Sequence, residues 1–213
     1  METIQKRWLT VLLTTALAAT VTTPVGAQAQ ADNRFEVTDG QFVMIVAGDS
    51  TGMDVVWVSD PEVEVVTASG DPVTARWAGH LTPTQVRAAD DWLATHETDC
   101  RVSVSRPWKE RGTYHVFVKN KSSQHCHGPG VDRHRSTLNL QARPNSDEFF
   151  YTQETDTWST LAGNSIRLQL AHQCVRARTY QWRSERYGTV YFGNGDRVYL
   201  PVIRTSPPRN YCF

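Results

Sequence analysis

All four cysteines of this chain lie in its second half, and they set the strongest limit on how the chain folds. They are Cys100, Cys126, Cys174 and Cys212. An even number of cysteines in an exported chain indicates disulfide bonds. The C-x-x-C spacing of many zinc sites does not occur, which disfavours a metal role for these residues. The sequence leaves three connectivities open. We favour Cys100–Cys126 and Cys174–Cys212, because each pair brackets a predicted strand–turn–strand segment.

The first 31 residues have the layout of a secretory signal peptide. Two basic residues, Lys6 and Arg7, precede an apolar, threonine-rich stretch over residues 8–19. Small-residue cleavage motifs follow, ending at Ala27, Ala29 and Ala31. The alternative is a membrane anchor, but a spanning helix needs about 20 apolar residues, more than this stretch supplies. We therefore expect a secreted, extracellular protein with no membrane span.

The charges of the chain are distributed unevenly. Its 22 Lys+Arg and 22 Asp+Glu give a formal net charge of zero. Residues 32–99, however, hold 13 acidic and 3 basic side chains, whereas residues 100–213 hold 8 acidic and 17 basic ones. We divide the mature chain accordingly into an acidic strand-and-helix portion, 32–99, and a basic β-sandwich-like portion, 100–213. Their opposite charges predict that the two portions dock, within one chain or between chains.

Short runs of β-branched and apolar residues between turn residues dominate the pattern. The run at 42–47 is apolar throughout, which predicts burial on both faces. Over residues 113–119 the side chains alternate, with Tyr114, Val116 and Val118 on the expected core face.

Two local signals stand out among these segments. The Gly-Asn-Gly-Asp sequence at 193–196 predicts a hairpin between strands at 190–192 and 197–200. A capping box starting at Thr82 predicts a helix over about 82–96. The sequence as a whole predicts a mainly β fold: a disulfide-stapled, β-sandwich-like C-terminal portion with a smaller acidic strand-and-helix portion before it.

The second half also carries a resemblance. It has the cysteine spacing described above, with Tyr180 and Arg183 in a predicted strand after the third cysteine and two prolines, at 207 and 208, before the last one. In these features residues 100–213 resemble small secreted actinobacterial proteins with two disulfides and an all-β body. The resemblance implies that fold, and it assigns no activity or functional residue.

A cluster of arginines and aromatic residues is the leading candidate for a ligand surface. If residues 175–183 form a strand, Arg176, Arg178, Tyr180 and Trp182 share one face. Guanidinium groups and aromatic rings together suit sugars and anionic polymers. Further basic residues would extend this surface: Lys119, Lys121, Arg133 and Arg135. The alternative is a solvated sheet face in which the arginine stems cover the rings.

A second cluster contains histidines. His125 and His127 project to one side of an extended segment, and His134 or Asp132 would complete a three-ligand zinc or copper site. The alternative is a polar loop of surface histidines beside a disulfide, and the neighbouring arginines, Arg133 and Arg135, disfavour a cation. We therefore expect no cofactor.

The sequence shows no recognised catalytic motif of the nucleophile-elbow, zinc-protease, P-loop or dinucleotide type. Our leading hypothesis is a secreted, non-enzymatic binding or interaction protein for an anionic polymer or a glycan. One alternative is a secreted hydrolase, such as a phosphodiesterase, with histidines in a basic cleft. Its acid–base groups would be His115, His125 or His127 with Glu154, Glu185 or Asp196. A second alternative is a structural envelope protein.

Overall fold

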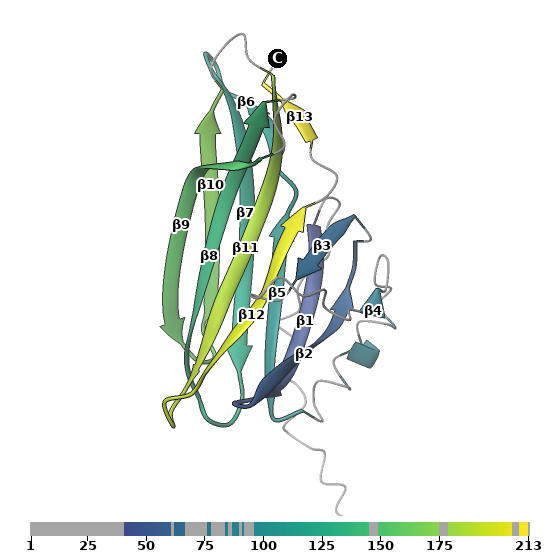
Figure 1. The fold of residues 1–213 in the computed structure, drawn as a ribbon, viewed down its shortest axis with the longest axis vertical. Helices are drawn as coiled ribbons and strands as arrows, with labels where there is room; N and C mark the ends of the chain where they lie inside the picture. Colours follow the sequence, from purple (N-terminus) through teal and green to yellow (C-terminus); the bar gives the residue numbers. More distant parts are fainter. Residues whose placement is uncertain are drawn as a thin grey trace, which may run out of the picture. The chain divides into compact units, whose positions relative to one another are not determined.

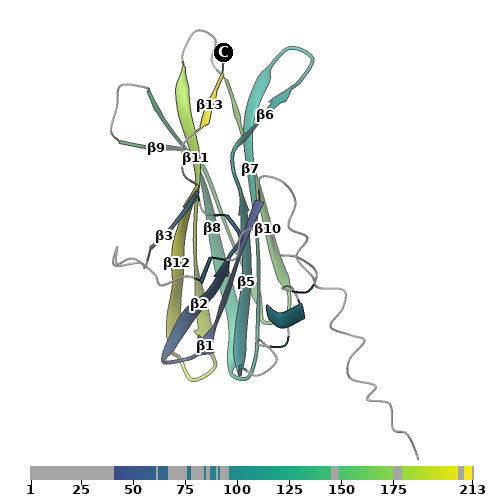
Figure 2. The same cartoon turned by 90° about the vertical axis from the view of Figure 1, so that its right-hand side faces the viewer.

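The chain forms two antiparallel β-sheets packed face to face as a sandwich. The computed structural model describes residues 41–60, 62–66, 76–77, 84, 87–89, 91, 96–144, 149–174, 179–205 and 209–212. Figure 2 shows the two sheets edge-on. Buried hydrophobic side chains from both sheets form the core between them. The predicted mainly β, disulfide-stapled fold class is confirmed. The predicted signal peptide at 1–31 lies outside the described residues.

One sheet, called sheet A here, has the strand order β10-β7-β5-β1-β2-β4, and β6 pairs with β7. Its neighbours run antiparallel except for the short parallel pair of β2 and β4. The strands are β1 (Gln41–Asp49), β2 (Gly52–Val58), β4 (Arg76–Trp77), β5 (Thr98–Ser105), β6 (Trp108–Arg111), β7 (Val116–His127) and β10 (Ser165–Gln173). The acidic and basic portions of the sequence thus contribute to the same sheet (Figure 1).

The other sheet, sheet B, has the order β3-β12-β11-β8-β9, and β13 pairs with β11. Its strands are β3 (Val63–Val66), β8 (Val131–Pro144), β9 (Tyr151–Leu161), β11 (Tyr180–Phe192), β12 (Arg197–Thr205) and β13 (Arg209–Tyr211). Figure 1 shows β8 and β11 running side by side along this sheet, and their pairing is continuous from Tyr180 to Phe192 with one irregularity near the end.

The core lies between the sheets and draws on both portions of the chain. Phe42 and Met44 of β1 are fully buried there, together with Leu138 of β8 and Ile203 of β12. The alternate residues of β1 are buried on the outer side of sheet A, in a second cluster with Ala89. The prediction that the run at 42–47 is buried on both faces is therefore confirmed.

Both favoured disulfides are present. Cys100–Cys126 joins β5 to β7 at directly paired positions inside the core. Cys174–Cys212 links the end of β10 to the residue after β13, so it ties sheet A to sheet B. Two disulfides are consistent with an oxidising, extracellular setting.

The described residues of the predicted helix are helical up to Asp91, whereas His96 is not. Thr84, residues 87–89 and Asp91 have helical conformation. Apart from His96, the rest of the predicted range lies outside the described residues. Ala89 is 1% exposed and packs on the outer side of β1. Within the part of the chain that the structure describes, no helix is long and apolar enough to cross a membrane.

The predicted hairpin is confirmed, while the predicted core face of residues 113–119 is wrong at Tyr114. β11 and β12 are joined through residues 193–196, and Gly195 has a φ of 93°, which favours glycine. Tyr114, however, is 82% exposed rather than in the core. The reason is a tight turn in which the Gly112 N–H donates to the His115 carbonyl. β7 therefore begins only at Val116, and from there the alternation holds, with Val118 fully buried.

Ion pairs join the acidic and basic portions of the sequence. Arg106 donates to Asp60 over 2.7 Å and also contacts Glu62. Arg204 lies 3.5 Å from Glu64. These contacts, the strand pairing of β1 with β5 and that of β3 with β12 place residues from both portions around one shared core.

Candidate ligand-binding face

The outer face of sheet B carries exposed basic and aromatic side chains at one end. Successive residues of a strand point to opposite sides of a sheet. Because His134 and Ser136 of β8 are fully buried, their neighbours Arg133 and Arg135 point outward, and both are exposed. The sandwich therefore fixes the direction of these two guanidinium groups.

Strand register brings further side chains beside these arginines. Tyr191 of β11 is the direct partner of Arg133, and Arg197 of β12 is the direct partner of Tyr191. In the next row of side chains on this face, Arg135 of β8 pairs with Thr189 of β11, and Thr189 pairs with Tyr199 of β12. We call the resulting surface the basic–aromatic face. It consists of Arg133, Arg135, Tyr187, Tyr191, Arg197 and Tyr199.

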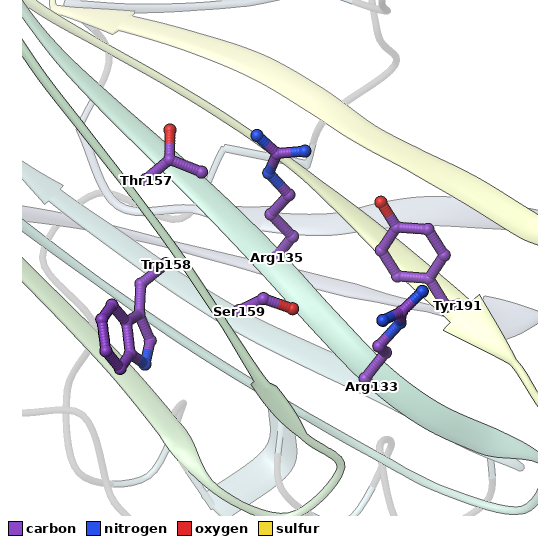
Figure 3. Close-up of a pocket in the computed structure, with 6 residues that line it drawn as sticks. All are labelled: Arg133, Arg135, Thr157, Trp158, Ser159 and Tyr191. Atoms are coloured by element: carbon purple, nitrogen blue, oxygen red, sulfur yellow. The ribbon is translucent and has the colours of Figure 1, made fainter.

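A hollow of about 370 Å³ lies on this face. It is lined by Arg133, Arg135, Thr157, Trp158, Ser159 and Tyr191. Figure 3 shows both guanidinium groups, the Tyr191 ring and the Thr157 and Ser159 side chains on one side of the sheet, with the Trp158 indole turned to the other side of β9. The hollow thus offers charged and hydroxyl groups together with aromatic side chains, Tyr191 and Trp158.

The guanidinium groups of this face are oriented but not neutralised. Arg133 lies over the Tyr191 ring at 4.7 Å from its centroid, and Arg197 lies 5.7 Å from that of Tyr199. Such contacts contribute about 0.5–1 kcal/mol at exposed sites and restrict the arginine side chains. Among the described residues, no carboxylate forms an ion pair with Arg133, Arg135 or Arg197. Three positive charges therefore remain available to an anionic ligand.

The other end of the same sheet face contrasts with this one, because its charges are paired. The Arg204 Nε donates to Glu185 over 2.8 Å, and Asn139 and Gln141 donate to the same carboxylate. Arg183 donates to Gln141 and stacks on Phe150 at 4.0 Å. Burial, with the nearby Arg204 charge, lowers the pKa of Arg183. This end of the face is internally satisfied and offers little to a ligand.

The ligand cluster predicted at 176–182 is only partly described, and its described residues face the core. Arg176 and Arg178 lie outside the described residues. Tyr180 and Trp182 do share a face, with ring centroids 6.1 Å apart. That face is the inner one, however: Trp182 is 2% exposed and belongs to the core, and Tyr180 packs against it. Trp182 therefore presents no surface to a ligand, which corrects the expectation for this residue.

The basic residues expected to extend the cluster divide between the two sheets. Arg133 and Arg135 lie on sheet B, in the basic–aromatic face. Lys119 and Lys121 lie on β7 of sheet A, where Lys119 pairs with Glu110 at 2.6 Å and Lys121 lies 6.0 Å from the Trp108 ring. The two lysines therefore do not extend the surface of sheet B.

The histidines proposed as metal ligands take different roles. His134 is fully buried, and its two ring nitrogens lie 3.0 Å from Gln124 Nε2 and 3.0 Å from the Asn164 carbonyl oxygen. Burial lowers its pKa to about 4, so it is neutral at pH 7. His125 and His127 lie side by side with ring centroids 5.4 Å apart. Within the described residues, no group of three His, Cys, Asp or Glu side chains is arranged to hold a metal ion.

His125 and His127 lie in a polar group on the outer side of sheet A. Nδ1 of His127 contacts the carboxylate of Asp99, whose other oxygen accepts from Arg101 Nε at 3.2 Å. Asp99 and Arg101 are almost completely buried. Burial, followed by the charge of His127, lowers the pKa of His125, and Ser165 Oγ lies 3.3 Å from its Nδ1. No sequence pattern indicated this group, because Asp99 and His127 meet only through the pairing of β5 with β7.

The acid–base pairs expected for a hydrolase are not the ones that form in the described part of the chain. Glu154 lies 2.9 Å from His172, and His115 contacts Gln173. Glu185 accepts from Arg204, and Asp196 accepts from Asn194. The expected partners are therefore engaged elsewhere.

The residues of the basic–aromatic face that sequence reasoning missed are Tyr191, Arg197 and Tyr199. A signal for them was present in the predicted hairpin. Pairing strands 190–192 and 197–200 around a tight turn places Tyr191 beside Arg197, and alternation puts Tyr199 on the same face as Arg197. The missing information was that β8 lies on the other side of β11 and brings Arg133 and Arg135 to the same surface.

The fold and the site together define a disulfide-stapled β-sandwich with an exposed basic–aromatic sheet face. A comparison with protein-family models and with curated proteins finds no match to this chain.

Proposed function

We propose that this protein acts outside the cell as a non-enzymatic binding protein, and that its basic–aromatic face holds an anionic glycan polymer. The observation that carries this proposal is the group of three exposed guanidiniums, on Arg133, Arg135 and Arg197, without carboxylate partners among the described residues. Guanidinium groups bind carboxylate, sulfate and phosphate groups with two parallel hydrogen bonds. An acidic polymer supplies such groups repeatedly along its length.

The tyrosines give the face a preference for sugars over a bare anion. Tyr187 is 41% exposed and Tyr199 is 54% exposed, so their rings are accessible. Aromatic side chains provide large apolar contacts with a polar tip, which suits the mixed surface of a sugar ring. The hydroxyl groups of Thr157 and Ser159 at the hollow add hydrogen-bonding groups of the kind that sugars use.

Affinity chromatography and titration with a sulfated polysaccharide such as heparin test the proposal. We expect the double variant Arg133→Gln/Arg135→Gln to bind about tenfold more weakly, since each exposed charge contact contributes up to about 1 kcal/mol. Binding of the unaltered protein should weaken as salt rises, because the contacting charges are exposed.

The matched control is Arg111→Gln/Arg167→Gln, which removes the same charge from exposed positions on β6 and β10 of sheet A. We expect this control to keep the affinity of the unaltered protein. An equal loss in both double variants would show that only the net charge matters and would contradict a specific face. No binding of any acidic polysaccharide by the unaltered protein would also reject the proposal.

A further inference from the structure

A charged side chain lies inside the sandwich. Arg186 is fully buried, although its chain neighbours Glu185 and Tyr187 point to the outer side of sheet B. It belongs to the inward set of β11, between Ser184 and Gly188. The interior of this fold therefore contains a guanidinium group where a sandwich core ordinarily holds an aliphatic side chain.

The guanidinium has no partner among the described residues. None of its Nε, Nη1 and Nη2 atoms has a hydrogen-bond acceptor there, and no described carboxylate forms an ion pair with it. Burial lowers the pKa of Arg186 to about 9, which still leaves the group charged at neutral pH. A buried charge without a counter-charge is strongly unfavourable, so the fold needs something to offset it.

The surroundings of the guanidinium are polar and built from small residues. A Cβ at Gly188 would lie 2.7 Å from Arg186 Nη2 and 2.6 Å from Gln124 Oε1, so the ends of both side chains lie close to this glycine. Ser136 of β8 is the direct partner of Gly188. On β7, Ser122 is the inward-facing residue immediately before Gln124. The hydroxyl groups of both serines and Oε1 of Gln124 are buried and have no hydrogen-bond partner among the described residues.

We propose that a small monovalent anion of the halide class binds inside the sandwich, held by the Arg186 guanidinium and the hydroxyl groups of Ser122 and Ser136. The guanidinium supplies several N–H donors and the serines supply two O–H donors, all of which suit an anion. A cation is excluded by the charge of Arg186. A large polyatomic anion is disfavoured, because closely packed core residues such as Leu138 and Trp182 are almost completely buried in the same layer.

This site is separate from the basic–aromatic face. Arg133 and Arg135 point outward from β8, whereas Ser136 points inward from the same strand. A small anion bound only by the folded state stabilises that state in proportion to the logarithm of its concentration. Anion binding at Arg186 therefore stabilises the fold whether or not the outer face binds a polymer.

Thermal unfolding in chloride tests the inference. Chloride is exchanged for the bulky anion gluconate at constant ionic strength. Once the chloride concentration is high enough to saturate the site, we expect the Tm of the unaltered protein to rise with each further tenfold increase in chloride. The variant Arg186→Met should lose this dependence, and the exposed control Arg167→Met on β10 should keep it. A Tm that is independent of chloride in the unaltered protein overturns the inference, as does an equal dependence in Arg186→Met.

Because Arg186→Met can fail to fold, a second measurement uses the unaltered protein. Crystals grown in bromide should show an anomalous peak within contact distance of the Arg186 guanidinium. Ordered water alone at this position, or bromide confined to the outer surface, overturns the inference.

Discussion

The outer faces of the two sheets are built by the same alternation of side chains but differ in their relation to solvent. On sheet A, around β1 and β5, the outer residues are covered: Val43 is 3% and Arg101 is 6% exposed. The charge of Arg101 there has a carboxylate partner in Asp99. On sheet B, Arg133 and Arg135 are exposed and have no carboxylate partner among the described residues. A buried charge needs a compensating partner, as Arg101 has in Asp99, whereas an exposed charge stays available to a ligand.

The largest expected effect comes from breaking the charge pairing on the covered face. Asp99→Ala removes the carboxylate that accepts from Arg101 and contacts His127. Removing one partner of a buried ion pair costs about 3–5 kcal/mol. We expect chemical denaturation to show a loss of this size. The control Asp132→Ala, at an exposed position of β8 on sheet B, should change the unfolding free energy by less than about 0.5 kcal/mol. Equal losses would remove the distinction between the two faces.

His134, which is buried between the two sheets, should make the stability of the fold depend on pH. The pKa of His134 is about 4 in the folded protein against an ordinary value of 6.5. Between these values the unfolded state binds more protons, so protonation favours unfolding. The stability contributed by neutral His134 is therefore fully present above pH 6.5 and is lost progressively as the pH falls toward 4.

Denaturation midpoints measured across this range check the prediction. His134→Gln keeps a hydrogen-bonding side chain but cannot titrate, so the acid-induced loss of stability should be smaller in this variant. An identical pH dependence in both proteins would show that other groups cause it, among which His125 also has a lowered pKa.

The smallest expected effect concerns the exposed face itself. Among the described residues, Arg135 has no ion-pair partner and no aromatic ring contact of the kind that holds Arg133, and Arg135→Gln removes its guanidinium. We expect its unfolding free energy to stay within about 0.5 kcal/mol of the unaltered protein. Differential scanning calorimetry measures this. A large destabilisation would mean that Arg135 supports the fold rather than a ligand, and the comparison of the two faces would fail.

Local sequence signals predicted local structure well. The apolar run at 42–47 gave burial on both faces, because no polar residue interrupts it. The Gly-Asn-Gly-Asp turn fixed the β11–β12 hairpin through the positive φ that Gly195 adopts. The favoured disulfides were confirmed, because each links the ends of segments that fold back on themselves.

Which side of β11 faces the core could not be predicted from the local sequence in the same way. Alternation showed that Tyr180 and Trp182 share a face, but it does not say which face is the core one. The inward set of β11 holds the polar Ser184 and the charged Arg186 together with the apolar Trp182, Val190 and Phe192. The predicted strand at 175–183 ended before Val190 and Phe192, which are the residues that mark this set as apolar. Only the packing of sheet A against sheet B decides the matter. For that reason the candidate face moved from residues 176–182 to Arg133 and its neighbours.

We propose that the exposed end of sheet B, with Arg133, Arg135, Arg197 and Tyr191, binds an anionic glycan polymer. The most direct measurement is an NMR titration of the unaltered protein with a defined acidic oligosaccharide, following the arginine Nε–H and tyrosine ring signals. We expect the signals of these four residues to shift together and saturate with one affinity, while those of Arg111 and Arg167 of the other sheet stay unchanged. Shifts centred on sheet A, or small shifts spread over all exposed arginines, would contradict it.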